Sequence, residues 1–432
     1  MRITMFAIGS TGDVRPYIVL GRELKTRGHE ITICAFADFE STVHKEGMYF
    51  KPISGDVKAL MANMMNGSTG VGFLKQVRDS LVDIIDPFLE DLEAACEGAE
   101  AIIGTYLGQV LQSLAEVRHI PYIQTHYFPM DKNACTPITT APGHHVGRAW
   151  NLASYELGYF IISVMEKYYL SDWREKHGMS PRKLEGAPKY ELNGHTIPVL
   201  YAISPLVMPR PASWKENIHM TGFWRDDRDV EYTPSPELAA FLAAGEKPIY
   251  VGFGSMVSGD MGETLGIVLD AVRESGVRAI LSRGWGGKEI PDDPNVFVAD
   301  FVPHDWLFQH VAGVVHHGGA GTTAAGILAC CPTLVIPFGG DQPFWAGRAR
   351  ELGIGPKPIP RDKLTVSKLS KAFTDLTTTG KYRVAAQELG ERMRMEQGHI
   401  IAANIVEREL REWLRLEGRE PAIVPVQTTI SC

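Results

Sequence analysis

The segment His316-His317-Gly318-Gly319-Ala320-Gly321-Thr322-Thr323 decides the fold class, because it joins an apolar, β-rich run to an apolar helical run. Glycines at such a turn let the backbone approach a ligand closely, and the free N–H groups at a helix start favour an anion. Histidine beside the glycines adds a hydrogen-bond donor or a charge. A purely structural tight turn would need the glycines but not the histidine. The segment therefore predicts an anion site, suited to a diphosphate, at the carboxyl edge of a sheet.

Short apolar runs alternate with helical runs in both halves of the chain, which is the pattern of doubly wound α/β sheets. The β-rich runs of the first half are Arg2–Ile8, Ile31–Phe36, Ala101–Ile103 and Tyr122–Gln124. Those of the second half are Pro248–Phe253, Arg278–Leu281, Val296–Ala299, Gly313–His316 and Thr333–Pro337. A long helical region over 146–176 interrupts the first series. Packing of this region on the sheet is the preferred interpretation, and lining of a pocket is the alternative.

A stretch rich in Pro, Trp, Asp and Arg between Ser204 and Pro236 marks a domain boundary. We expect an N-terminal domain over 1–230 and a C-terminal domain over 236–405. A C-terminal helix and tail are expected over 406–432. The fold class is therefore α/β, with two doubly wound, Rossmann-like domains facing a central cleft.

The composition excludes several classes of function. The chain has 432 residues and a formal net charge of -8, without a long basic run, so nucleic-acid binding is not supported. The N-terminus does not read as a signal peptide, and no apolar run reaches the roughly 18 residues of a membrane span. Six cysteines without a CxxC pair are typical of reduced core thiols. We therefore expect a cytoplasmic protein that binds small molecules.

Asp13 is the candidate catalytic residue. It lies in the turn Gly9-Ser10-Thr11-Gly12-Asp13-Val14-Arg15-Pro16, between the first β-rich run and the first helical run. The glycine spacing is GxxG, which fails the GxGxxG fingerprint of dinucleotide-binding proteins. A helix N-cap is the structural interpretation of this aspartate, and a general base at a ligand-binding edge is the functional one.

Two further turns carry polar groups at the carboxyl ends of expected strands. One is Val251-Gly252-Phe253-Gly254-Ser255, and the other is Phe338-Gly339-Gly340-Asp341-Gln342-Pro343. A carboxylate beside an amide suits the vicinal hydroxyls of a sugar. By contrast, Asp227-Arg228-Asp229 has the spacing of a metal-binding DxD but lies between the domains, and we interpret it as a solvated acidic loop. His144 and His145 lack an i, i+4 partner, so we interpret them as a polar loop beside the acceptor site.

Six motifs together resemble a known family. They are GSTGDVRP (9–16), VGFGS (251–255), SRGWG (282–286), FVPHDWLF (301–308), VHHGGAGTT (315–323) and PFGGDQPFW (337–345). In this order they resemble the GT-B glycosyltransferases of family 1, most closely the sterol 3-beta-glucosyltransferase and antibiotic aglycone glycosyltransferase branch. The resemblance implies the GT-B fold and an inverting, metal-independent hexosyltransferase. It also implies that the domain over 1–230 binds the acceptor and that the domain over 236–405 binds the nucleotide-sugar donor. The donor would be a UDP- or TDP-sugar, with UDP-glucose preferred, and the acceptor a hydroxyl of a lipophilic sterol, terpenoid or polyketide.

The resemblance also implies roles for individual residues. Asp13 would be the general base. The donor-binding residues would be Ser255, Val302, His304, Trp306, His317, Gly319, Gly321, Thr322, Asp341 and Gln342. Among them His317, Gly319, Gly321, Thr322 and Ser255 would hold the diphosphate. Asp341 and Gln342 would hold the sugar, and 301–304 would lie against the base. Trp306 or Trp285 would supply an aromatic face to that base.

No cofactor and no metal are implied beyond the nucleotide sugar itself, and peripheral contact with a membrane is compatible with a lipophilic acceptor. Three other functions share part of the pattern. A Rossmann-type oxidoreductase explains the alternation but lacks GxGxxG. A sugar-nucleotide epimerase of GT-B architecture explains the glycine segment without an acceptor. A non-catalytic nucleotide-sugar sensor would leave Asp13 without a chemical role.

Overall fold

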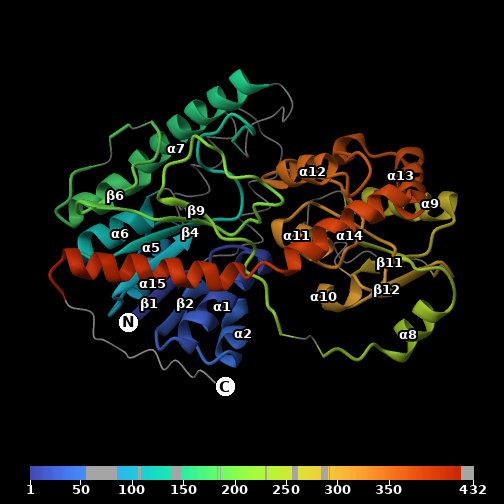
Figure 1. The fold of residues 1–432 in the computed structure, drawn as a ribbon, viewed down its shortest axis with the longest axis horizontal. Helices are drawn as coiled ribbons and strands as arrows, with labels where there is room; N and C mark the ends of the chain where they lie inside the picture. The colour runs from blue at the N-terminus through green and yellow to red at the C-terminus, as the bar shows by residue number, and fades with distance from the viewer. Residues whose placement is uncertain are drawn as a thin grey trace, which may run out of the picture.

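The computed structural model describes residues 1–54, 85–105, 109–138, 147–181, 183–184, 186–228, 231–254, 261–283, 290 and 292–419. Figure 1 shows two lobes, each built on a parallel sheet with helices around it. The chain passes from the first lobe to the second after β9 and returns to the first with its last helix.

The N-terminal lobe contains a seven-stranded parallel sheet in the order β3-β2-β1-β4-β5-β8-β9. Its strands are β1 (Arg2–Phe6), β2 (Glu30–Phe36), β3 (Tyr49–Ile53), β4 (Ala101–Thr105), β5 (Tyr122–His126), β8 (Val199–Tyr201) and β9 (Ile218–Met220). Its helices are α1 (Thr11–Thr26), α2 (Glu40–Lys45), α5 (Ile85–Ala95), α6 (Val110–Arg118) and α7 (Arg148–Lys176). The strand order reverses between β1 and β4, and ligands bind outside the carboxyl ends of parallel strands at such a switch point. The turn from β1 into α1, which carries Asp13, lies there.

The C-terminal lobe contains a five-stranded parallel sheet in the order β12-β11-β10-β13-β14. Its strands are β10 (Ile249–Gly252), β11 (Ala279–Ser282), β12 (Val296–Ala299), β13 (Gly313–His316) and β14 (Thr333–Val335). Its helices are α8 (Pro236–Ala243), α9 (Met261–Ser275), α10 (His304–Leu307), α11 (Ala320–Leu328), α12 (Gln342–Glu351), α13 (Val366–Thr378) and α14 (Gly380–Arg394). The switch point lies between β10 and β13, so the glycine segment after β13 also occupies a ligand-binding edge. The two doubly wound sheets expected from the sequence are confirmed.

The last helix, α15 (Gly398–Leu416), packs on the N-terminal lobe and not on the sheet that precedes it in the chain (Figure 1). Its apolar face, with Ala402, Val406 and Leu410, belongs to the same buried cluster as Val14 of α1. A Cβ atom at Gly398 would come within 2.4 Å of the carbonyl oxygen of Phe223, so glycine is needed where the chain crosses back. Residue 406, where the sequence analysis began its C-terminal helix, falls inside α15, and 420–432 lie outside the described residues.

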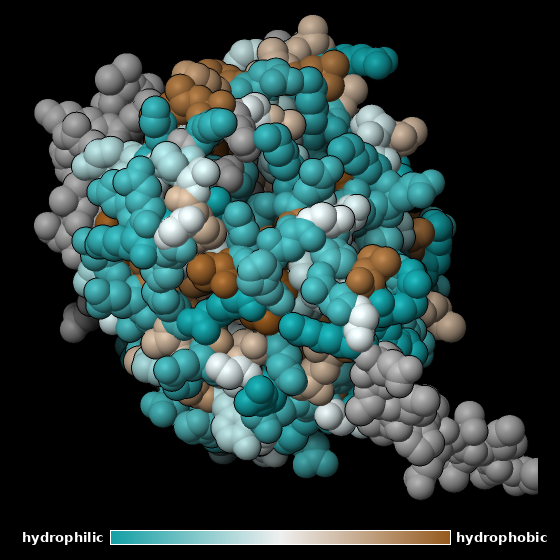
Figure 2. Space-filling model, turned by 90° about the vertical axis from the view of Figure 1, so that its left-hand side faces the viewer, coloured by the Kyte–Doolittle hydropathy of each residue, from teal (hydrophilic) through white to brown (hydrophobic). Residues whose placement is uncertain are grey.

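The expected long helix is present as α7, a helix of 29 residues. It packs against the protein, as preferred from the sequence: Leu170 and Trp173 are buried in the core, and Tyr159 Oη donates to the carbonyl of Met130 at 2.9 Å. Its outer face exposes large apolar side chains, including Phe160 and Tyr168. Figure 2 shows hydrophobic side chains gathered at the top of a mostly hydrophilic face, at the level of α7. Among the described helices, α7 included, none combines the length and the apolar character that crossing a bilayer requires.

Candidate functional site

The turn from β1 into α1 holds Asp13 in place through Ser10. Ser10 is the N-cap of α1, and both its backbone N–H and its hydroxyl donate to Asp13 Oδ2, at 2.7 and 2.9 Å. Gly9 has φ of +145°, and a Cβ atom there would lie 2.3 Å from Asp13 Oδ2. The N-cap interpretation of Asp13 was therefore wrong in position: Asp13 is the third helical residue and completes a capping box that Ser10 opens.

The environment of Asp13 favours a proton acceptor with a raised pKa. Burial raises the pKa of its carboxyl group, and the hydrogen bonds from Ser10 oppose that rise. Behind it, Tyr127 Oη donates to the backbone carbonyl of Asp13 at 3.2 Å. Tyr17, Tyr127 and Trp224 pack edge to face beneath the turn. The first turn of α1 thus contacts a cluster of three aromatic side chains through Tyr127.

The glycine cradle, residues 316–323, has the geometry of an anion site. Gly318, with φ of +99°, donates its N–H to His316 Nδ1 at 3.0 Å. Gly319 is the N-cap of α11, and its carbonyl accepts both the N–H and the hydroxyl of Thr323 at 2.9 Å. The N–H groups of 320–322 precede the first intrahelical hydrogen bond and remain available to a ligand.

Two histidines in the cradle carry donor atoms without a protein partner. His317 Nδ1 and His316 Nε2 are buried and have no hydrogen-bond partner within the part of the chain that the structure describes. Burial, with a smaller effect of nearby His304, lowers the pKa of His317 to about 4, so its imidazole is neutral near pH 7. Of the two options left open by the sequence, this favours a neutral hydrogen-bond donor over a charge. His316 was not predicted as a site residue, and its position at the end of β13 was the available signal.

Asp341 and Gln342 lie at the start of α12. Asp341 Oδ2 accepts from Trp345 Nε1 at 2.9 Å. Gln342 Oε1 accepts the backbone N–H groups of Phe338 and Gly339, at 2.7 and 3.2 Å. The carbonyl of Gln342 therefore shapes the loop, and any contact of this side chain with a sugar would go through its amide nitrogen.

Asp13 and Asp341 come from different lobes, yet the charge of Asp13 reaches Asp341. Burial raises the pKa of Asp341 to about 7, and the negative charge of Asp13 is the second cause. The start of α1 also meets the start of α11, which follows the cradle glycines: a Cβ atom at Gly321 would lie 3.8 Å from the Cα of Gly12. The fold therefore brings the candidate base, the cradle and the candidate sugar-binding carboxylate to one site between the lobes.

The loop from 301 into α10 carries two aromatic side chains that differ in their surroundings. Trp306 stacks on His310 with centroids 4.1 Å apart and contacts Tyr232, so part of its ring surface is already covered by the protein. Phe301 is 86% exposed and lies directly beside Val302, which is buried. Phe301 is therefore better placed than Trp306 to cover a base.

His304 in the same loop is also held inside the protein. Its ring stacks on Phe308, and its Nε2 lies 3.3 Å from Tyr250 Oη. Burial lowers the pKa of His304 to about 4, so it is neutral near pH 7. Ser255, Trp285, His144 and His145 lie outside the described residues.

The acidic stretch between the lobes is ion-paired. Asp227 pairs with Arg225 and lies 3.7 Å from His399, and Arg228 pairs with Glu46 and Asp226. The side chains of Asp227 and Arg228 are 40% and 56% exposed, so the described part of this stretch is solvated as well as ion-paired, and Asp229 lies outside the described residues. In the described ranges, no group of three His, Cys, Asp or Glu side chains is placed to hold a metal ion.

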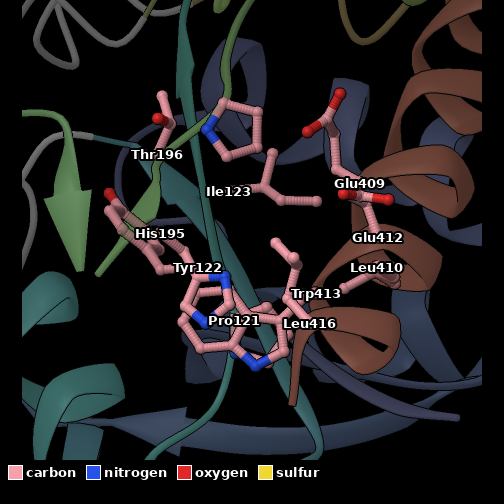
Figure 3. A pocket seen from close by; sticks show the side chains of 11 residues that line it. Pro121, Tyr122, Ile123, His195, Thr196, Glu409, Leu410, Glu412, Trp413 and Leu416 are labelled. Atoms are coloured by element: carbon pink, nitrogen blue, oxygen red, sulfur yellow. The ribbon is translucent and has the colours of Figure 1, made fainter. Parts of the chain in front are cut away.

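A surface pocket of about 190 Å³ lies away from this site (Figure 3). It is lined by the amino end of β5, by His195 and Thr196, and by Glu409, Glu412 and Trp413 of α15. Asp13 and the cradle follow the carboxyl ends of their strands, whereas this pocket lies at an amino end. None of the residues singled out from the sequence lines it.

Two family models match the chain, one in each lobe. Residues 3–134 match the glycosyltransferase family 28 N-terminal domain. Residues 282–406 match the C-terminal domain of the erythromycin biosynthesis protein CIII-like family. The second match includes the loop at 301–304, the cradle and Asp341.

Curated relatives are similar to nearly the whole chain. The sterol 3-beta-glucosyltransferase of Neosartorya fischeri is 34% identical over 439 residues, which cover 98% of this chain and 30% of that protein. The sterol 3-beta-glucosyltransferase of Pichia angusta is 33% identical over 426 residues, covering 95% of this chain and 33% of that protein. The chain thus spans about a third of the length of these relatives.

Solved structures share the fold at lower sequence identity. The glycosyltransferase of kitacinnamycin superposes with a TM-score of 0.68 at 21% identity, covering 95% of this chain and 98% of that one. The calicheamicin glycosyltransferase CalG4 gives a TM-score of 0.64 at 17% identity, covering 95% and 98%. VinC, solved in complex with DTDP, gives 0.63 at 18% identity, covering 96% and 100%. These similarities show that the two lobes form the GT-B fold.

Proposed function

We propose that this chain, which has the GT-B fold and is homologous to the sterol 3-beta-glucosyltransferases, is a metal-independent glycosyltransferase. It would move a hexose from a nucleoside diphosphate sugar to a hydroxyl of a small lipophilic acceptor. The observation that carries this proposal is the meeting of Asp13 with Asp341 and the cradle at one site between the lobes.

The proposed reaction is a single displacement with inversion. The acceptor hydroxyl transfers its proton to Asp13 as its oxygen attacks the anomeric carbon. The bond between that carbon and the diphosphate oxygen breaks on the opposite face, and the nucleoside diphosphate leaves with the electron pair. The N–H groups at the start of α11, together with neutral donors from His316 and His317, stabilise the charge on the leaving group.

The donor would lie along the carboxyl edge of the C-terminal sheet. Thr322, Gly321 and Gly319 would surround the diphosphate, and Asp341 would accept hydrogen bonds from sugar hydroxyls. Exposed Phe301 would cover the base beside the backbone of Val302. UDP-glucose is the preferred donor, since the curated relatives are named as glucosyltransferases, and a TDP-sugar is the other candidate, since VinC was solved with DTDP.

The acceptor would lie against the N-terminal lobe, next to Asp13. A sterol is favoured by the names of the curated relatives, and terpenoid and polyketide alcohols remain the other candidates.

The described cysteines are all free, which supports a reducing compartment such as the cytoplasm.

The test is a matrix of UDP- and TDP-sugars against sterol, triterpene, polyketide and phenolic acceptors, with mass-spectrometric detection of products. Transfer of one hexose from one donor class, with an inverted anomeric bond by NMR, is the expected result. Conversion of the sugar nucleotide to an isomer without any acceptor would identify a sugar-nucleotide epimerase instead. Tight nucleotide-sugar binding without turnover would identify a sensor.

A further inference from the structure

One ion pair joins α1, the helix that carries Asp13, to α10 of the other lobe. Residues 301–304, which lead into α10 and are proposed to lie against the base, are called the nucleotide loop below. Arg15 Nη2 lies 2.7 Å from Asp305 Oδ2, within hydrogen-bond distance. Arg15 belongs to α1, and Asp305 belongs to α10. The contact therefore connects two segments that the chain keeps 290 positions apart.

Both partners are neighbours of residues already placed at the site. Arg15 follows Asp13 by two residues in the first turns of α1, and Asp305 directly follows His304. The charges of both reach the nucleotide loop, because Arg15 lowers and Asp305 raises the pKa of His304. The pair is thus part of the surroundings of that loop.

The rest of α10 is fixed within its own lobe. Leu307 and Phe308 are buried in the core, and Trp306 contacts Tyr232 of the chain segment that joins the lobes. With α10 held there, Asp305 presents its carboxylate to α1. A nucleotide that contacts 301–304 would therefore lie beside the ion pair that joins α10 to α1 and to the turn that carries Asp13.

We propose that Arg15 and Asp305 are a positioning pair, which couples occupation of the nucleotide loop to the placement of the catalytic turn. This inference rests on the proposed function and adds to it a contact between the two lobes. Neither residue is assigned contact with the reacting atoms.

The exposure of the pair fits a contact that forms and breaks. The side chains are 49% and 39% exposed, and exposed ion pairs contribute little and are weakened by salt. Such a pair can bias the relative placement of the lobes without locking it. Loss of the pair should therefore change nucleotide affinity and turnover by about threefold to fivefold.

The experiment reverses the pair and restores it. Arg15→Glu and Asp305→Arg are made singly and together, and UDP and TDP affinities are measured by calorimetry beside kcat and KM. Each single reversal should weaken nucleotide binding and lower kcat/KM by about tenfold, since repulsion replaces attraction. The double variant should return to within about twofold of wild type. Weaker binding of UDP or TDP by Arg15→Glu would indicate coupling between the lobes, because Arg15 lies in the lobe opposite the nucleotide loop.

The matched control is the exposed pair Arg415–Glu412, whose side chains are 66% and 49% exposed and lie within α15 alone. Its reversal should leave nucleotide affinity unchanged. If the Arg15 and Asp305 reversals behave like this control, or if the double variant is no better than the singles, the proposal is overturned. If a reversal variant does not fold, Arg15→Gln and Asp305→Asn are measured in its place. Each should weaken nucleotide binding and lower kcat/KM by about threefold.

The result can be separated from the fate of the proposed function. Wild-type protein that binds UDP or TDP, responds to the reversals and transfers no sugar would refute the transferase and retain the coupling. Wild-type protein that transfers sugar, with reversal variants that bind UDP and TDP as tightly as wild type, would refute the coupling and retain the transferase.

Discussion

Replacement of Asp13 by Asn should lower kcat by about 10²–10⁴-fold while leaving donor affinity near wild type, because the substitution removes only the proton acceptor. At about 1.36 kcal/mol per decade, this loss corresponds to roughly 3–5 kcal/mol of transition-state stabilisation. Asn keeps the size of the side chain and retains an oxygen that can accept a hydrogen bond from Ser10.

The competing explanation for a defect in this variant is loss of helix stability. Asp13 accepts two hydrogen bonds from Ser10, at 2.7 and 2.9 Å. Weakening such a cap costs about 1 kcal/mol, against a typical stability of about 5–15 kcal/mol, so nearly all molecules would stay folded. A rate loss of two decades or more therefore cannot arise from unfolding.

The assay compares kcat for an unactivated alcohol with kcat for an acidic phenol, and follows the melting temperature in parallel. The rate loss should be smaller for the phenol, which needs less help in losing its proton. Because Asp13 must be ionised to act, wild-type kcat should fall as the pH drops through its raised pKa, and this acid limb should disappear in Asp13→Asn.

Ser10→Ala serves as the matched control, because it removes one hydrogen bond that lowers the pKa of Asp13. It should move the acid limb to higher pH and keep turnover above the limb. Wild-type kcat of Asp13→Asn on an unactivated alcohol would refute the assignment. Two histidines would then be the next candidates for the base: His126 is buried, which lowers its pKa to about 3, and His144 lies outside the described residues.

Three further outcomes are expected. Activity should survive excess EDTA, since the cradle donors stabilise the leaving group; loss of turnover that magnesium or manganese restores would contradict this. His317→Ala and Thr322→Ala should each raise the donor dissociation constant by about tenfold with little change in acceptor KM, and unchanged calorimetric affinities for UDP and TDP would show that the diphosphate lies elsewhere. The raised pKa of Asp341, about 7, means that the folded state binds an extra proton between about pH 4 and 7. The stability that this proton binding adds to the folded state is therefore present below pH 4 and lost as the pH rises through 7. Asp341→Asn should accordingly melt at a higher temperature than wild type at pH 8 and at the same temperature near pH 4.

Part of the site could be predicted from the sequence because it depends on neighbouring residues. The turns at 9–16 and 316–323 each combine a strand end, glycines and a helix start within a few positions, and the structure places both at switch points. Asp13 could be singled out for the same reason. Its exact position in the cap could not, because the choice of Ser10 as the N-cap depends on backbone angles within the turn.

The two strand–helix series, the long α7 and the glycine cradle could be predicted from local patterns, because hydrophobic periodicity and turn chemistry act over short distances along the chain. Which distant groups meet depends instead on how the lobes pack. The tertiary structure set Asp341 within electrostatic reach of Asp13, paired Arg15 with Asp305, and returned α15 to the first lobe. It also buried one face of Trp306 and left Phe301 exposed. These outcomes depend on how two separately folded sheets pack and on which surfaces that packing removes from water, which no local pattern of residues specifies.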